Sequence, residues 1–203
     1  MALSSREFEP REMLDHLKAV IASERFLRME SLNNEVPFFI CPYPIERHRE
    51  IQEIYRLLTN QLVDQGIRVL EIDLFKVTHT ILQDRGIWDQ VLEAERTSTK
   101  AELLELLQAV LDPQEHLIPA IRREIEASHP AVMLITGVGE VFPYIRSHNV
   151  LNNLQSVAKD FPTVMFFPGR YTHELASGAS LDLFGCLHDD KYYRAFNILH
   201  VEA

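Results

Sequence analysis

The sequence predicts an α/β fold with a mostly parallel, five-stranded sheet and helices on both faces. Three observations lead to this prediction. Short, uniformly apolar runs recur along the chain, as expected of strands that are buried on both faces of a sheet. Helical patterns separate these runs, as the crossover connections of parallel strands require. The 203 residues, 46% hydrophobic and 25% charged, suit one globular α/β domain over residues 1–203.

The first half of the chain begins with alternating helices and strands. Apolar residues at helical spacing predict a first helix over 10–29. A run at 36–41 predicts the first strand, and the helix that follows, over 45–66, ends near Gly66 as a C-terminal cap. The second predicted strand covers 68–75. Its distance from the first suits a right-handed crossover between parallel strands.

Residues from about 76 to 128 contain no strand-like run and predict a helical insertion that covers one face of the sheet. Within it, the leucines at 101–111 exceed one helical stripe. The sheet then resumes with a third strand at 131–136, a helix over 146–159 and a fourth strand at 163–167 that stops at Pro168 and Gly169. A last strand is expected at 195–201.

The segment after the first predicted strand bears on phosphate binding. The layout resembles the core of P-loop nucleotide hydrolases, in which a glycine-rich loop with Lys and Ser/Thr follows the first strand. Here the segment CPYPIER (41–47) has no glycine, lysine, serine or threonine, and its two prolines lack an amide hydrogen. We therefore expect a P-loop-like core without a phosphate-binding loop. Arg47, His48 and Arg49 read more simply as a solvated basic start of the next helix than as an anion site.

Signatures of catalysis and metal binding are missing from the sequence. The nine histidines form no H-x-x-x-H or H-E-x-x-H pair, the two cysteines lie far apart, and no G-x-S-x-G motif occurs. We therefore expect no metal, no cofactor and no catalytic residue, and we predict that the chain is not an enzyme.

The charge balance and the N-terminus narrow the partners and the compartment. Thirty acidic residues against twenty basic ones give a formal charge of −10, which disfavours direct nucleic-acid binding. Such binding would require six arginines to share one face: Arg47, Arg49, Arg122, Arg123, Arg146 and Arg170. The first residues contain no apolar leader, and no apolar run approaches the roughly 20 residues of a membrane helix. We expect a cytoplasmic protein that does not bind membranes.

The most specific polar pattern follows the third predicted strand, where two glycines lead to a helix start rich in Asn. Because Asn is a poor helix former, some contact has to offset its cost, and Ser147 is expected to cap the helix. Asp73 is expected to cap a turn or to bind a backbone amide. The carboxyl ends of parallel strands meet at one edge of a sheet, so the polar groups at these ends are expected close together. The candidate partner- or ligand-binding residues are Asp73, Arg146, Ser147, His148, Asn149, Asn152, Asn153 and Arg170.

This polar pattern supports two interpretations equally. In the first, the Asn and Ser side chains only connect the helix to neighbouring loops. In the second, they form a ligand or partner surface at the C-terminal edge of the sheet.

Seven motifs, taken in order, resemble the BrxB family, which comprises small proteins encoded within bacterial and archaeal BREX phage-defence systems. The motifs are NEVPFFI (34–40), LEIDL (70–74), TGVG (136–139), RSHN (146–149), LNNL (151–154), FFPG (166–169) and DKYYRAF (190–196). The resemblance spans nearly the whole chain. It implies a role in antiviral defence beside a methyltransferase, a large ATPase and the alkaline-phosphatase-like protein PglZ, and it supplies no catalytic residue.

Two functional hypotheses follow. The first is an adaptor that binds another BREX subunit, with PglZ as the first candidate, to support host DNA methylation and phage restriction. The second is a sensor or enzyme that binds a nucleotide or phosphorylated metabolite at the C-terminal edge of the sheet. The sequence leaves a homodimer open in both cases.

Overall fold

The computed structural model describes residues 8–30, 36–174, 178–189 and 195–202. Its centre is a sheet whose parallel part has the order β2-β3-β4-β1-β7, and each neighbouring pair in this order is parallel. The strands are β1 (Phe38–Tyr43), β2 (Val69–Asp73), β3 (Val132–Thr136), β4 (Thr163–Glu174) and β7 (Phe196–Asn197). The predicted α/β fold with a mostly parallel sheet is confirmed.

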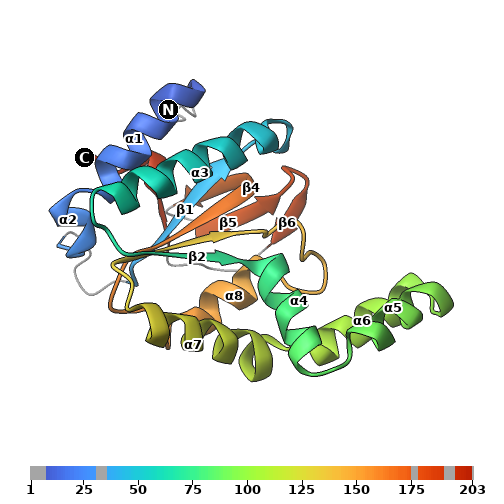
Figure 1. Cartoon of the computed structure of the whole chain (residues 1–203). Helices are drawn as coiled ribbons and strands as arrows, with labels where there is room; N and C mark the ends of the chain where they lie inside the picture. The colour runs from blue at the N-terminus through green and yellow to red at the C-terminus, as the bar shows by residue number, and fades with distance from the viewer. Residues whose placement is uncertain (1–7, 31–35, 175–177, 190–194, 203) are drawn as a thin grey trace.

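Helices lie on both faces of this sheet (Figure 1). On one face α1 (Pro10–Ile21) and α3 (His48–Asp64) form a core with the strand side chains Val164 and Phe166. On the other face α4 (Leu74–Asp84), α7 (Ile118–Ser128) and α8 (Ser147–Leu154) form a second core with Met165 and Phe167. Successive side chains of β4 therefore enter opposite cores, which explains the uniformly apolar run.

The predicted first helix at 10–29 is two helices in the structure. α1 ends at Ile21, and α2 (Glu24–Leu27) begins after Ser23. The Ser23 hydroxyl accepts a hydrogen bond from the Phe26 amide at 3.2 Å, so Ser23 caps α2. Apolar spacing continues through this break, which is why periodicity alone predicts one helix.

The segment between β1 and α4 follows the prediction, with one change at its end. A short 3₁₀ turn, η1 (Ile45–Arg47), leads into α3, and Gly66 follows α3 with a φ of +80°, a backbone conformation that glycine adopts without strain. The predicted strand at 68–75 ends earlier, at Asp73, because the Asp73 side chain accepts from the Lys76 amide at 3.2 Å and starts α4.

Five helical elements lie between β2 and β3. After α4 come α5 (Trp88–Thr97), α6 (Lys100–Val110), the π-helical turn η2 (Pro113–Leu117) and α7. Thr99 and Glu102 form a capping box that starts α6. The predicted covering of one sheet face by the insertion holds only in part: α4 and α7 contact β2, whereas the α5–α6 hairpin extends away from the sheet (Figure 1).

The fourth strand does not stop at Pro168 and Gly169 as predicted. β4 runs on to Glu174, and its second half pairs antiparallel with β5 (Gly178–Leu183), which pairs with β6 (Leu187–Asp189). Gly169 permits this continuation because a Cβ there would lie 2.2 Å from the Asp182 carbonyl oxygen. Among the described residues the sheet therefore has seven strands where five were predicted.

The last strand is shorter than the predicted 195–201. β7 comprises Phe196–Asn197 and is followed by the 3₁₀ turn η3 (Ile198–His200). The Asn197 side chain accepts from the Leu199 amide at 3.0 Å, which favours the turn over a longer strand. None of the helices within the described ranges has both the length and the apolar character needed to span a membrane.

Candidate functional site

The start of α8 holds three of the predicted site residues. Arg146 occupies the N-cap position and Ser147 is the first helical residue, and no side-chain bond closes the cap, so the predicted capping role of Ser147 is wrong. Ser147 and His148 are 8% and 5% exposed and face the interior. Arg146 is exposed, and its guanidinium carbon lies 6.0 Å from the centroid of the Phe142 ring. Of the three, Arg146 is the one that a partner can reach.

The three asparagines of α8 differ in their surroundings. The Asn153 side-chain amide donates to the Asn149 carbonyl at 2.7 Å, one turn earlier in the same helix. Both residues are partly buried, whereas Asn152 is exposed. A local contact therefore offsets part of the helical cost of Asn153, and Asn152 remains available to solvent.

The loop between β3 and α8 fills much of the C-terminal edge of the sheet. At Gly137, where φ is +75°, a Cβ would lie 2.9 Å from an Asp73 carboxylate oxygen and 3.1 Å from the Leu74 amide. At Gly139 a Cβ would lie 3.0 Å from Phe184 and 3.2 Å from Pro168. Both glycines thus permit the loop to approach neighbouring elements closely, so the chain's own backbone lies where an open α/β sheet commonly binds a ligand.

Aromatic and charged side chains surround the position where a phosphate-binding loop would follow β1. The Tyr43 hydroxyl and His48 Nδ1 are hydrogen-bonded at 3.0 Å. Burial, followed by the charges of Cys41 and Glu140, raises the pKa of Tyr43 above its ordinary range.

The basic start of the helix after β1 is engaged by the fold. Arg47 Nε donates to the Glu50 carboxylate at 2.7 Å, and Arg47 Nη1 donates to the Phe8 carbonyl at 2.9 Å. A side chain held by an internal acid and a carbonyl is not free to collect an anion. This agrees with reading Arg47 to Arg49 as a helix start.

Asp73 and Arg170 lie on different elements. Asp73 Oδ1 accepts from the Lys76 amide, and its Oδ2 lies 3.4 Å from Lys76 Nζ, so the expected contact with a backbone amide is confirmed. Arg170 is exposed in the second half of β4, where it faces Asp182 in the antiparallel register. Because β4 does not stop before it, Arg170 belongs to a hairpin strand and not to a loop after the parallel sheet.

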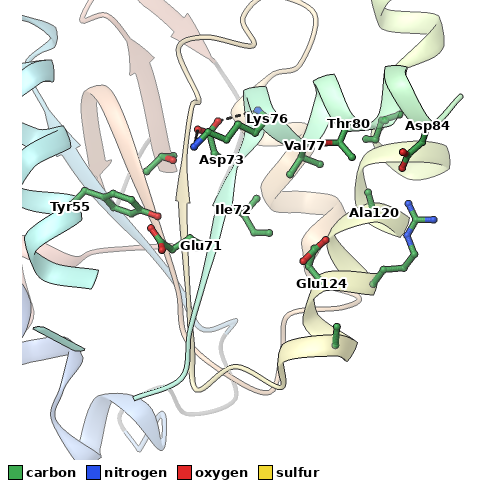
Figure 2. A pocket seen from close by; sticks show the side chains of 14 residues that line it. Tyr55, Glu71, Ile72, Asp73, Lys76, Val77, Thr80, Asp84, Ala120 and Glu124 are labelled. Atoms are coloured by element: carbon green, nitrogen blue, oxygen red, sulfur yellow. Dashed lines mark hydrogen bonds and ion pairs between the residues drawn. The ribbon is translucent and has the colours of Figure 1, made fainter. Parts of the chain in front are cut away.

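A groove of about 600 Å³ runs along the outer edge of β2 (Figure 2). One wall is α3, the other is formed by α4 and α7, and the floor is β2 itself. Figure 2 shows the Tyr55 hydroxyl and the Glu71 carboxylate pointing toward one another on one side of β2, with Ile72 on the other side. The groove is lined by Tyr55, Glu71, Ile72, Asp73, Lys76, Val77, Thr80, Ile81, Asp84, Ala120, Arg123, Glu124, Ala127 and Thr136.

Negative charge dominates this groove. Burial, with a further contribution from the Glu71 carboxylate, raises the pKa of Tyr55 above its ordinary range, so Tyr55 stays protonated. The groove would repel a phosphate anion and attract a cation. Its four carboxylates are Glu71, Asp73, Asp84 and Glu124, and its two cations are Lys76 and Arg123.

The groove was not found by reasoning from the sequence. Of the eight predicted site residues, all of which lie in described ranges, Asp73 lines it and the other seven do not. The one available signal is Glu71, an acid between two apolar residues in the middle of the strand. Its exposure depends on β2 being the outer strand, and strand order is not visible in a single sequence.

No metal centre forms within the described ranges, where no group of three or more His, Cys, Asp or Glu side chains is arranged to hold an ion. Cys41 is buried, and burial raises the pKa of its thiol, while Cys186 is exposed on the turn between β5 and β6.

Comparison with known proteins identifies the family. The sequence family described as BREX protein BrxB matches residues 70–198. A BREX protein BrxB from Bacillus cereus (strain H3081.97) is 31% identical over 192 residues, which cover 93% of this chain and 96% of the relative. The chain belongs to the BrxB family. A BREX protein BrxB from Escherichia coli O9:H4 (strain HS) is 26% identical over 186 residues, with 92% and 90% covered.

Membership of the BrxB family confirms the resemblance that the seven motifs indicated. The family match covers six of these motifs wholly, while NEVPFFI precedes it. Part of NEVPFFI and most of DKYYRAF lie outside the described residues. No solved structure matches this BrxB-family chain.

Proposed function

We propose that this BrxB-family chain is a non-catalytic adaptor that binds another BREX subunit, with PglZ as the first candidate. Through that contact it supports host DNA methylation and phage restriction. Family membership makes the chain a component of a BREX phage-defence system. The adaptor role is supported by a surface that fits a protein partner and by the chemistry of the edge where a nucleotide would bind.

The proposal rests mainly on α6, a helix with an apolar face that the described part of the chain does not bury. α6 has no buried residue, although four of its eleven residues are leucines. Leu107 packs against the central core, whereas Leu103, Leu104 and Leu106 do not belong to either core. Helices normally bury their apolar face, and an apolar face that stays partly exposed is typical of a protein-binding surface.

The apolar face of α6 is too wide for α5 to cover. At 100° per residue, the four leucines span an arc of about 160° around the helix. α5 contacts α6 and buries only Val91 of its own residues. We call Leu103, Leu104 and Leu106 the leucine face of α6. Packing of a partner helix against this face would complete the burial that the hairpin begins.

The non-catalytic part of the proposal is supported by the position after β1. Where a P-loop core would present backbone amides to a phosphate, this chain has Pro42, Tyr43 and Pro44. The Tyr43 hydroxyl is hydrogen-bonded to the His48 ring. We interpret the sheet as a P-loop-like scaffold in which side chains occupy the place after β1 where a phosphate would otherwise bind.

Co-purification tests the adaptor. The tagged chain is expressed with each subunit of its BREX system in turn, and one subunit, PglZ first, is expected to elute with it at micromolar concentration. If every subunit elutes without it, the adaptor proposal is wrong.

A variant of the leucine face tests, in the same experiment, whether this face binds the partner. Leu103→Gln combined with Leu106→Gln should lower recovery of the partner about tenfold or more, because a buried leucine contributes about 1.5–3 kcal/mol. Glu105→Gln, at an exposed position of the same helix, is the matched control. Thermal unfolding of both variants establishes that α5 and α6 still fold. Equal recovery with the two variants would remove the leucine face from the proposal.

The ligand-sensor alternative is separated by thermal shift. A ligand at 100 times its dissociation constant adds about 2.7 kcal/mol to the free energy of unfolding. We expect no shift with nucleotides or phosphorylated metabolites, because the acidic groove repels phosphate and Arg47 is engaged by Glu50. A nucleotide-dependent shift that Arg146→Ala or Arg170→Ala abolishes would favour the sensor.

A further inference from the structure

β2 is one of the two outer strands of the parallel sheet, and its outer edge faces the groove of Figure 2. Among the described strands it pairs with β3 and with no other. An edge strand presents N–H and C=O groups that can hydrogen-bond an additional strand. The edge of β2 is therefore a template for a further strand, framed by α3 on one face and by α4 and α7 on the other.

The backbone groups of Val69, Glu71 and Asp73 are directed away from β3, and of these residues Glu71 and Asp73 line the groove. The Arg68 carbonyl accepts from the Val132 amide at 3.3 Å, so Arg68 directs its backbone groups toward β3. Hydrogen-bonding groups alternate between the two sides of a strand in the parallel pattern. Every second residue after Val69 therefore directs its N–H and C=O away from β3.

The side chains on the two faces of this edge have different chemistry. On the face of α3, Glu71 lies beside the Tyr55 hydroxyl, and the Tyr55 ring packs edge-on against Phe166 with centroids 5.2 Å apart. On the opposite face, Ile72 and the α7 residues Ala120 and Ala127 line the groove. A strand added here would place alternate side chains near the acid and near the small apolar residues.

The charges of the groove determine whether a basic or an acidic segment is favoured for binding. Lys76 is already paired with Asp73 at 3.4 Å, and the exposed Arg123 and Glu124 are neighbours on α7. The four carboxylates of the groove exceed its two cations by two. A basic side chain directed into the groove therefore gains attraction, and an acidic one meets repulsion.

We propose that the outer edge of β2 accepts an extended segment of a partner protein, in which lysine or arginine alternates with aliphatic residues, as an additional strand of the sheet. The inference rests on the proposed adaptor function and gives the adaptor a second contact surface. Main-chain hydrogen bonds to Val69 and Glu71 provide affinity. The basic side chains meet Glu71, and the aliphatic ones contact the two alanines of α7, which provides specificity.

A second copy of this chain fits the edge less well than such a segment. Edge-to-edge pairing of two β2 strands would bring Glu71 and Asp73 of both chains into one ladder. Like charges at opposed positions of a sheet are destabilising. A β2-edge homodimer is therefore the outcome that contradicts the inference.

Peptide binding to the full chain tests the sign of the charge. Two labelled seven-residue peptides, one alternating lysine with valine and one alternating glutamate with valine, are titrated by fluorescence anisotropy at low salt. The basic peptide is expected to bind about tenfold more tightly than the acidic one. Glu71→Lys should lower its affinity about tenfold and reverse the preference. Glu53→Lys, an equal charge change at an exposed position of α3 outside the groove, should leave the preference unchanged.

Amide hydrogen exchange tests the backbone contact. The amides of Leu70 and Ile72 face β3 and should be protected with or without peptide. The Glu71 amide faces the groove and should gain protection of at least about tenfold at saturating basic peptide. If the Glu71 amide stays unprotected while the peptide is bound, the contact is electrostatic only and strand addition is wrong.

Failure of this inference differs from failure of the adaptor proposal. Equal affinity of the two peptides, equal effects of Glu71→Lys and Glu53→Lys, or a dimer that Glu71→Lys alters would overturn the strand addition. Co-purification with a BREX subunit would in those cases still support the adaptor. If the basic peptide binds as expected while no BREX subunit co-purifies, the edge is supported and the adaptor is contradicted.

Discussion

Polar residues gather at two places in this molecule, the start of α8 and the outer edge of β2, and the fold uses them differently. At α8, Ser147 and His148 are buried, and the Asn153 side chain bonds to a carbonyl of its own helix. At β2, Glu71 is exposed on an edge strand whose backbone faces a groove. Polar residues whose hydrogen bonds are made within the fold stabilise it. Polar residues on an unpaired strand edge are available to a partner.

The largest expected effect concerns the buried side of α8. Leu154 is fully buried, so Leu154→Ala should lower the free energy of unfolding by about 3 kcal/mol, through lost burial and the cavity left behind. Urea denaturation measures this. Asn152→Ala, at an exposed position of the same helix, is the control and should change stability by about 0.5 kcal/mol or less. Equal losses in the two variants would mean that α8 is not packed as described.

A smaller effect is expected at the junction of β2 and α4. Asp73→Ala removes the side chain that caps α4 and should cost about 1 kcal/mol of stability. Asp73→Asn keeps a capping oxygen and removes the charge, and it should cost less, because the Lys76 ammonium is largely exposed in its ion pair. Denaturation of both variants separates the two roles. An equal loss for Asn and for Ala would show that charge, and not capping, is the main contribution.

The Asn153 bond should matter least for stability and tests whether α8 is also a contact surface. Asn153→Ala loses one partly buried hydrogen bond and replaces Asn by a better helix former, so the net change should stay within about 0.5 kcal/mol. Arg146 and Asn152 are the exposed residues of this region and stay predicted partner contacts. Co-purification of Arg146→Ala with PglZ checks that prediction: reduced recovery would extend the partner surface to α8.

The pH dependence of stability tests the surroundings of Tyr55 beside the β2 edge. The raised pKa of Tyr55 means that the folded state holds this proton more tightly than the unfolded chain, whose tyrosine has a pKa of about 10. Its contribution to stability is therefore complete below about pH 10 and is lost as the pH rises further. Tyr55→Phe should reduce the loss of stability between about pH 9 and 11. Val63→Ala, at an exposed position of the same helix, should keep the original pH dependence.

The sequence predicted the parallel sheet well because its strands are buried on both faces. Runs such as 131–135 and 164–167 are apolar at every position, and this pattern follows from helices packing on each side. It did not predict where β4 ends. Pro168 and Gly169 are typical of a strand end, but here Gly169 accommodates the Asp182 carbonyl of β5, a contact that exists only in three dimensions.

The candidate site was harder to predict than the fold for a related reason. Asp73 was placed correctly at the end of a strand, because an acid after an apolar run is a local feature. The groove beside it depends on strand order and on the distant α7, which brings Arg123 and Glu124 to β2. These are non-local contacts, and no spacing within the chain encodes them directly.

α4 joins the two surfaces proposed for partners. Lys76, Thr80 and Asp84 of this helix line the β2 groove, and Arg85 at its end donates a hydrogen bond to the carbonyl of Val110, the last residue of α6. A helix of eleven residues is about 16 Å long and bends little. The groove and the leucine face are therefore held at a fixed separation. A partner that engages one surface meets the other at high effective concentration, so two weak contacts combine into one of high avidity.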